Sequence, residues 1–200
     1  MKKLVILGIL CLVAACVGTS PSSQFYTMRT MDKTNAPVVS QTVSANIGVE
    51  QVKIPYMLDR PQMVVIGKNE IDVSISERHR WAEPLSIIIQ RKLTGDMSAV
   101  LPNAQIRNKN YALEKFDRSV VVDISVLTAT LGDKVTLEAW YTITDANGKT
   151  LARKKFTLSE PVGDTYEELV STQSDMVQQL AIAIAQTLAK QNKTLAAAHR

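Results

Sequence analysis

The sequence predicts a single α+β domain, in which a mainly antiparallel sheet carries two amphipathic helices packed on one face. Three observations support this. The second half contains long alternating apolar stretches joined by short turns, as in an antiparallel meander. Two other stretches carry apolar residues at intervals of three and four, as in helices that bury one face. The chain has no internal repeat or low-complexity block, and its 200 residues suit one core.

The first half is expected to hold short strands and one helix. Alternation and β-branched residues predict strands at residues 24–30, 47–54, 62–66 and 71–75, with a polar loop at 31–44 and a hairpin connection at 67–70. A helix is expected to begin between Trp81 and Pro84, since proline is tolerated in a first turn. Its apolar positions run from Leu85 to Met97, and Pro102 bounds it.

The second half predicts a meander followed by a long helix. The three strands are expected at residues 119–131, 134–144 and 150–158, and Asn147-Gly148 is a strong signal for the second hairpin. The helix begins at Tyr166, with Asp164 and Thr165 as caps. Its inward stripe holds apolar residues at helical spacing (Leu169, Val170, Met176, Val177, Leu180, Ala181, Ile184 and Leu188). We expect it to fray after Lys190, leaving residues 192–200 as a flexible tail.

The N-terminus has the anatomy of a secretory signal: Lys2 and Lys3, a short apolar run, then small residues. The run is too short to span a bilayer. Val13-Ala14-Ala15-Cys16 resembles the lipobox of bacterial lipoproteins, which predicts a signal peptide at residues 1–15, lipidation of Cys16 and a tether at 16–23. The alternative is an ordinary secretory signal that contains a cysteine by chance.

Lipidation would fix the protein to a membrane. A bacterial lipoprotein carries three fatty chains such as palmitate, and two or more chains hold stably. Val17 follows the cysteine where lipoproteins retained in the inner membrane commonly have Asp, so the expected location is the periplasmic face of the outer membrane. Since Cys11 leaves with the signal and Cys16 is acylated, the mature chain would have no disulfide.

Charge and composition give no indication of nucleic-acid binding or catalysis. Of 23 Lys+Arg against 19 Asp+Glu, removal of Lys2 and Lys3 leaves 21 against 19, a nearly neutral domain. We expect no enzyme activity, no metal and no cofactor apart from the lipid. His79, in the charged run 77–80, is expected to be a solvated loop residue. Asp59 and Glu83 are the candidate carboxylates if the protein is a hydrolase.

Two segments are denser in distinctive residues than a simple connection requires. The first, residues 54–62, contains Tyr56, Leu58, Asp59, Arg60 and Pro61; the second, residues 80–85, contains Arg80, Trp81 and Glu83. These eight residues are candidates for a partner interface. The alternative is structural: a turn and a helix cap that pack on each other.

The two segments carry a family resemblance. Phe25-Tyr26-Thr27-Met28, then "IPYMLDRPQMV" at 54–64 and "RWAEPL" at 80–85, resemble the PqiC-type family of ABC-transport auxiliary lipoproteins, with Met28 where the family usually has Leu. The resemblance implies a periplasmic domain at residues 24–191 that works with an inner-membrane MCE-domain protein of PqiB type. Such systems move lipids between the two membranes or keep the envelope intact. The family has no established catalytic residues.

Three hypotheses follow from the sequence. The leading one is a non-enzymatic accessory subunit that docks a periplasm-spanning partner. The others are a structural or assembly-pilot lipoprotein without a transport role, and an envelope hydrolase that uses Asp59 or Glu83. The sequence leaves open whether the protein forms a homo-oligomer and whether it binds the transported lipid itself.

Overall fold

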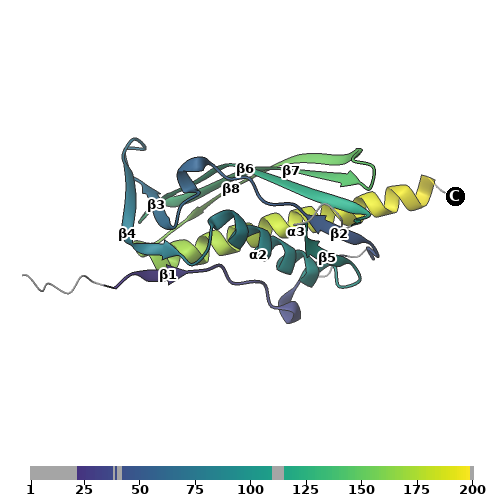
Figure 1. Cartoon of the computed structure of the whole chain (residues 1–200), viewed down its shortest axis with the longest axis horizontal. Helices are drawn as coiled ribbons and strands as arrows, with labels where there is room; N and C mark the ends of the chain where they lie inside the picture. Colours follow the sequence, from purple (N-terminus) through teal and green to yellow (C-terminus); the bar gives the residue numbers. More distant parts are fainter. Residues whose placement is uncertain (1–21, 38, 40–41, 110–114, 199–200) are drawn as a thin grey trace, which may run out of the picture.

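The computed structural model describes residues 22–37, 39, 42–109 and 115–198, with side chains up to residue 191. Cys16, Val17 and the signal segment therefore lie outside the described residues. The fold is a single α+β domain, as predicted, with its strands in two mixed sheets and two helices of three turns or more (Figure 1). No helix in the described part combines the length and the apolar character needed to cross a bilayer.

The larger sheet has the strand order β5-β2-β6-β7-β8. The predicted meander is confirmed: β6 (Arg118–Thr130), β7 (Lys134–Asp145) and β8 (Thr150–Pro161) pair antiparallel. Gly148 has φ +81°, which the Asn-Gly turn requires. On the other side of β6, β2 (Asn46–Val49) and the unpredicted β5 (Gln105–Asn108) add parallel strands. The expected strand at 47–54 therefore ends early, at Val49.

The smaller sheet has the order β1-β4-β3 and corrects two predictions. The expected strand at 71–75 is instead β4 (Val73–Trp81), so Trp81 ends a strand and does not begin a helix. The run Glu77-Arg78-His79-Arg80 shows no alternation, but β4 is the central strand and bonds to neighbours on both sides. These are β1 (Gln24–Tyr26), which is shorter than predicted, and β3 (Gln62–Ile66), which matches the prediction.

Two short 3-10 helices interrupt segments without regular structure. One (η2, Lys33–Asn35) lies in the expected loop at 31–44, and the other (η3, Tyr56–Leu58) lies in the first of the two dense segments. The second turns the chain immediately before Asp59 and Arg60.

The two helices lie beneath the five-stranded sheet (Figure 1). Helix α2 (Leu85–Val100) has Pro84 as its N-cap residue. Helix α3 (Tyr166–Ala198) runs most of the length of the molecule and continues beyond the end expected near Lys190. Its start is a capping box: the Glu168 N–H donates to Thr165 Oγ1 and the Thr165 N–H donates to Glu168 Oε2, each at 3.2 Å.

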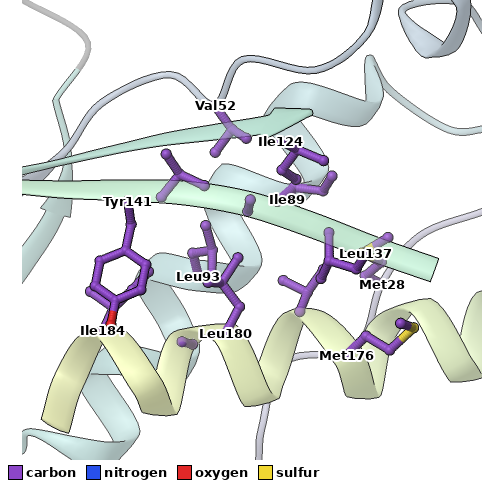
Figure 2. Packing of buried hydrophobic residues seen from close by; sticks show 14 of the residues in the cluster. Met28, Val52, Ile89, Leu93, Ile124, Leu137, Tyr141, Met176, Leu180 and Ile184 are labelled. Carbon is purple, nitrogen blue, oxygen red and sulfur yellow. The ribbon is translucent and has the colours of Figure 1, made fainter. Parts of the chain in front are cut away.

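The core lies between the helices and the large sheet (Figure 2). The inward stripe of α3 is buried as predicted, with Met176, Leu180 and Ile184 fully inaccessible and directed at β7, where Leu137 and Tyr141 lie. Helix α2 contributes Ile89 and Leu93 to the same cluster. The five-stranded sheet and the two helices thus form the stable body of the protein.

A buried ion pair attaches the segment after β1 to this body. Lys92 Nζ lies 2.8 Å from Asp96 Oδ2, and both side chains are inaccessible to solvent. Lys92 also donates to the Arg29 carbonyl at 2.6 Å, and Asp96 Oδ1 accepts the Met31 N–H at 2.6 Å. These bonds satisfy charges that would otherwise be costly to bury. They also fix the position of the chain that leads back to β1.

Candidate functional site

The fold brings the two dense segments side by side. The chain from Asp59 to Pro61 leads into β3, and the chain from Trp81 to Pro84 leaves β4 for helix α2. The strands are paired at this point, with Gln62 opposite Arg80 and the Trp81 N–H donating to the Pro61 carbonyl at 2.7 Å. On the other side of β4, the Ala82 N–H donates to the Tyr26 carbonyl at 2.8 Å.

A cleft of about 560 Å³ opens where these segments meet. It includes five of the eight predicted interface residues: Asp59, Arg60, Pro61, Trp81 and Glu83. The remaining lining comes from β1, from the chain after β2 and from the start of α2 (Phe25, Gln51, Ala82, Pro84, Ser86 and Ile87). We refer to it as the Arg60 cleft.

Three predicted residues do not line the Arg60 cleft. Tyr56 is 95% exposed on η3, three residues before Asp59. Leu58 is buried and packs in the core near Trp81 and Leu85. Arg80 is held by Glu77, with an ion-pair distance of 3.6 Å and a hydrogen bond from its Nε to the Glu77 carbonyl at 3.2 Å. Leu58 therefore supports the cleft from behind, and Arg80 is engaged by its own strand.

Arg60 is the unusual group in the cleft. Its Nε is buried and has no hydrogen-bond partner among the described residues. The neighbouring Asp59 carboxylate is exposed, and within the described part of the chain neither side chain forms an ion pair. A buried donor without a partner costs free energy, and native proteins keep few of them. The fold therefore leaves one donor of this cleft-lining arginine buried and unsatisfied.

Glu83 is held in place at the rim of the cleft. Its carboxylate forms an ion pair with Arg91 of α2, and Arg91 Nη2 also donates to Thr27 Oγ1 at 3.4 Å. Both partners of the ion pair are about half exposed, so it contributes little stability. Its effect is geometric, because it ties the start of α2 to the chain after β1.

Sequence reasoning missed the contribution of β1 to the cleft. Phe25 lines it while 65% exposed. An aromatic ring this exposed is a common feature of contact surfaces. Phe25 was visible in the sequence, but only the parallel pairing with Arg80 places it beside the two dense segments.

The sequence-based expectation that His79 is a solvated loop residue is wrong. His79 lies in β4, and its ring stacks on that of Tyr166 at the start of α3, with centroids 4.1 Å apart. Its Nδ1 is 2.8 Å from the Tyr26 hydroxyl, which donates to Glu167 Oε1 at 2.6 Å. The Tyr26 hydroxyl also lies 3.0 Å from Gln24 Oε1, and it has a single proton to share among these contacts. This cluster joins β1, β4 and α3.

The electrostatics of the cluster follow from these contacts. Burial, together with the hydrogen bond to Glu167, raises the pKa of Tyr26 to about 12. The hydrogen bond from Tyr26 lowers the pKa of Glu167. A tyrosine with a raised pKa stays neutral and is a poor nucleophile, so the cluster is suited to joining elements rather than to catalysis. Within the described residues, no three His, Cys, Asp or Glu side chains converge to hold a metal.

Comparison with known families agrees with this reading of the sequence. The model of a family described as "ABC-type transport auxiliary lipoprotein component" matches residues 26–185. The chain belongs to this PqiC-type family. The match covers both dense segments, helix α2, the meander and the first part of α3. Members are transport auxiliary lipoproteins of the envelope, and this is not a known enzyme family. A comparison with curated proteins gave no match.

Two solved structures share the fold of the PqiC-type domain. A protein from Xanthomonas campestris, assigned to the family DUF330, superposes with a TM-score of 0.72 at 12% identity, covering 86% of this chain and 99% of its own. The crystal structure of an uncharacterized protein gives 0.68 at 19% identity, covering 82% and 97%. At these identities, the likeness establishes the fold alone.

Proposed function

We propose that this protein is an outer-membrane lipoprotein and the accessory subunit of an MCE-type system for lipid transport or envelope integrity. In this proposal, residues 1–15 are removed, Cys16 carries the lipid and residues 16–23 tether the domain of residues 24–191 to the periplasmic face of the membrane. The Arg60 cleft then docks an inner-membrane MCE-domain protein of PqiB type. The protein acts by binding and performs no catalysis.

The observation that supports docking most strongly is that Arg60, whose Nε lacks a hydrogen-bond partner, lines a cleft built from both dense segments. The buried Nε needs an acceptor, and the Asp59 carboxylate beside it is free to accept a hydrogen bond. Phe25 adds exposed aromatic surface at the same place. Arginine and aromatic residues dominate the energetics of protein interfaces. A partner strand or loop that offers a carbonyl or carboxylate beside an apolar side chain would complement the half-buried Arg60 and the exposed Phe25.

The test is a pull-down of the tagged, lipidated protein from detergent-solubilised envelopes, with partners identified by mass spectrometry. The wild type is expected to recover an MCE-domain protein. Arg60→Ala should reduce this recovery at least tenfold, since a hydrogen-bonded charged group at an interface is worth 2 kcal/mol or more. Arg153→Ala is the matched control, because Arg153 is exposed on β8 in the other sheet and only stacks on Trp140.

The outcomes separate the three hypotheses. Equal recovery by Arg60→Ala and Arg153→Ala would refute the Arg60 cleft as the docking site. Recovery of the lipoprotein alone would favour a structural or assembly-pilot role. The hydrolase hypothesis predicts that Asp59→Asn or Glu83→Gln abolishes complementation of a deletion strain while the fold persists, and normal complementation by both would remove it.

A further inference from the structure

The hairpin of β3 and β4 carries an exposed apolar stripe that takes no part in the Arg60 cleft. Ile71, Val73 and Ile75 are 79%, 47% and 42% exposed. Alternate residues of a strand share a face, so Val73 and Ile75 lie on one side of β4, and Ile71 lies in the turn just before the strand begins. We call these three residues the hairpin stripe.

The register of the hairpin shows that the stripe belongs to a continuous apolar face. Val73 lies opposite Ile66 and Ile75 lies opposite Val64, two half-buried residues of β3. The opposite face is different, since Val65 is buried in the core and pairs with Ser74. Val64 on this face packs against the core, so the exposed apolar part of the face is Val73 and Ile75 of β4, where a soluble protein ordinarily places polar side chains.

The position of the stripe indicates what it contacts. Figure 1 shows the β3–β4 hairpin at the end of the molecule where the described chain begins, opposite the C-terminal end of α3. Gln24, the first residue of β1, pairs with His79 of β4. If Cys16 carries the lipid, eight residues separate the anchor from Gln24, which reach no more than about 28 Å when fully extended. The membrane surface is then held close to this end of the domain.

We propose that the hairpin stripe inserts shallowly into the outer-membrane bilayer surface and gives the domain a second membrane contact. This inference rests on the lipidation of Cys16 in the proposed function. The ligand is a phospholipid surface, recognised by apolar burial. Amphipathic elements of this kind sit roughly 5–10 Å into the boundary between headgroups and acyl chains.

The insertion is shallow because the hairpin tip carries the exposed charged residues Lys68, Glu70 and Asp72, which stay at the headgroup level, while backbone donors beside the stripe are satisfied internally. The Gly67 N–H donates to the Asp72 carbonyl at 2.7 Å. The N–H groups of Ile71 and Asp72 both donate to Asn69 Oδ1 at 3.1 Å. A backbone group that loses water without a partner costs several kcal/mol in a membrane, and these three donors already have partners.

A second contact would orient the domain. A lipid on a short flexible tether limits distance but leaves the domain free to rotate. With the hairpin stripe held at the membrane, the long axis of the molecule is fixed relative to the bilayer, and the C-terminal end of α3 points into the periplasm (Figure 1). The Arg60 cleft would then be presented in one orientation to a partner that crosses the periplasm.

The test uses full-length, lipidated protein reconstituted in phosphatidylethanolamine–phosphatidylglycerol vesicles. Val73→Cys places a single thiol in the stripe for a polarity-sensitive fluorophore, since Cys11 is removed and Cys16 is acylated. Asn147→Cys is the control, in the β7–β8 turn at the opposite end of the molecule (Figure 1). We expect a blue-shifted emission at position 73 that brominated lipids quench at least threefold, and no quenching at position 147.

Each outcome has a definite meaning. Unshifted emission at position 73 with lipid present on Cys16, confirmed by mass spectrometry of the N-terminal peptide, would overturn the hairpin proposal and leave the anchor intact. A blue shift without quenching would also overturn it, because protein and not lipid would cover the stripe. Absence of lipid on Cys16 would overturn both this inference and the anchor of the proposed function.

A second variant guards against misfolding. Ile71→Thr, Val73→Thr and Ile75→Thr together retain β-branched side chains, which suit a strand, but remove the apolar stripe. With the probe at Lys68→Cys on the hairpin tip, this variant should lose most of the lipid quenching seen without the three changes. Equal quenching in a protein with an unchanged melting temperature would refute the role of the stripe.

Discussion

The two sheets of this protein differ in how completely their apolar side chains are buried and their polar groups are hydrogen-bonded. In the five-stranded sheet, inward residues such as Val120, Leu137 and Ile143 are fully buried against the helices. The three-stranded sheet leaves Phe25 and the hairpin stripe exposed, and the chain entering it leaves the Nε of Arg60 without a partner. The difference is one of exposure: both sheets contribute residues to the core, but the large exposed apolar groups lie mostly on the three-stranded sheet and its hairpin.

Leu180→Asp should have the largest effect, because it breaks the stable region. Leu180 is fully buried on the inward stripe of α3, where Asp would place an unpaired carboxylate in the core. We expect a loss of roughly 3–5 kcal/mol in the free energy of unfolding, measured by urea denaturation. Gln186→Asp, on the exposed side of the same helix, is the control and should change stability by less than about 0.5 kcal/mol. A Leu180→Asp protein as stable as this control would contradict our assignment of the core.

The stable region is also the one that the sequence predicts best. The meander and α3 follow from local patterns, since alternation and the three–four spacing arise directly from burial on one face. The smaller sheet does not. Most residues of β4 are charged or polar, and it is a strand because β1 and β3 bond to it from both sides. Likewise, β5 has one buried residue, Ile106, and a single buried residue does not produce the apolar alternation by which a strand is recognised in a sequence.

The candidate site was predictable in composition but not in geometry. The two dense segments identified Asp59, Arg60, Pro61, Trp81 and Glu83, all of which line one cleft. Their convergence depends on the pairing of β3 with β4. The burial of Leu58, the exposure of Phe25 and the missing partner of Arg60 are products of tertiary packing, which no local pattern records.

Tyr26→Phe should have a smaller, pH-dependent effect at the junction of the two regions. The pKa of Glu167 is lowered by the Tyr26 hydrogen bond, so this contribution to stability is present above pH 4.5 and is lost as acid protonates the carboxylate. The pKa of Tyr26 is raised from 10 to about 12 in the fold, so its contribution is present below pH 10 and is lost between pH 10 and 12.

The stability advantage of wild type over Tyr26→Phe should therefore be greatest between pH 5 and 9 and shrink at both extremes. Thermal melting of both proteins across this range measures it. His79 shares the cluster, so His79→Gln in the Tyr26→Phe background separates its contribution. A stability advantage that is constant from pH 3 to 12 would mean that the Tyr26 hydroxyl does not form the hydrogen bond to Glu167 in solution.

The smallest effect on stability is expected for Arg60→Met. Methionine keeps the apolar part of the side chain and removes a buried donor that has no partner, so stability should stay within about 1 kcal/mol of wild type or rise. Arg118→Met makes the same change in the large sheet, where Nη1 donates to the Leu188 carbonyl at 3.2 Å, and should cost about 1.5–3 kcal/mol. If urea denaturation shows equal losses for the two variants, Arg60 supports the fold as Arg118 does. A loss confined to Arg118→Met would instead show that the Arg60 guanidinium does not stabilise the fold, as the proposed docking role requires.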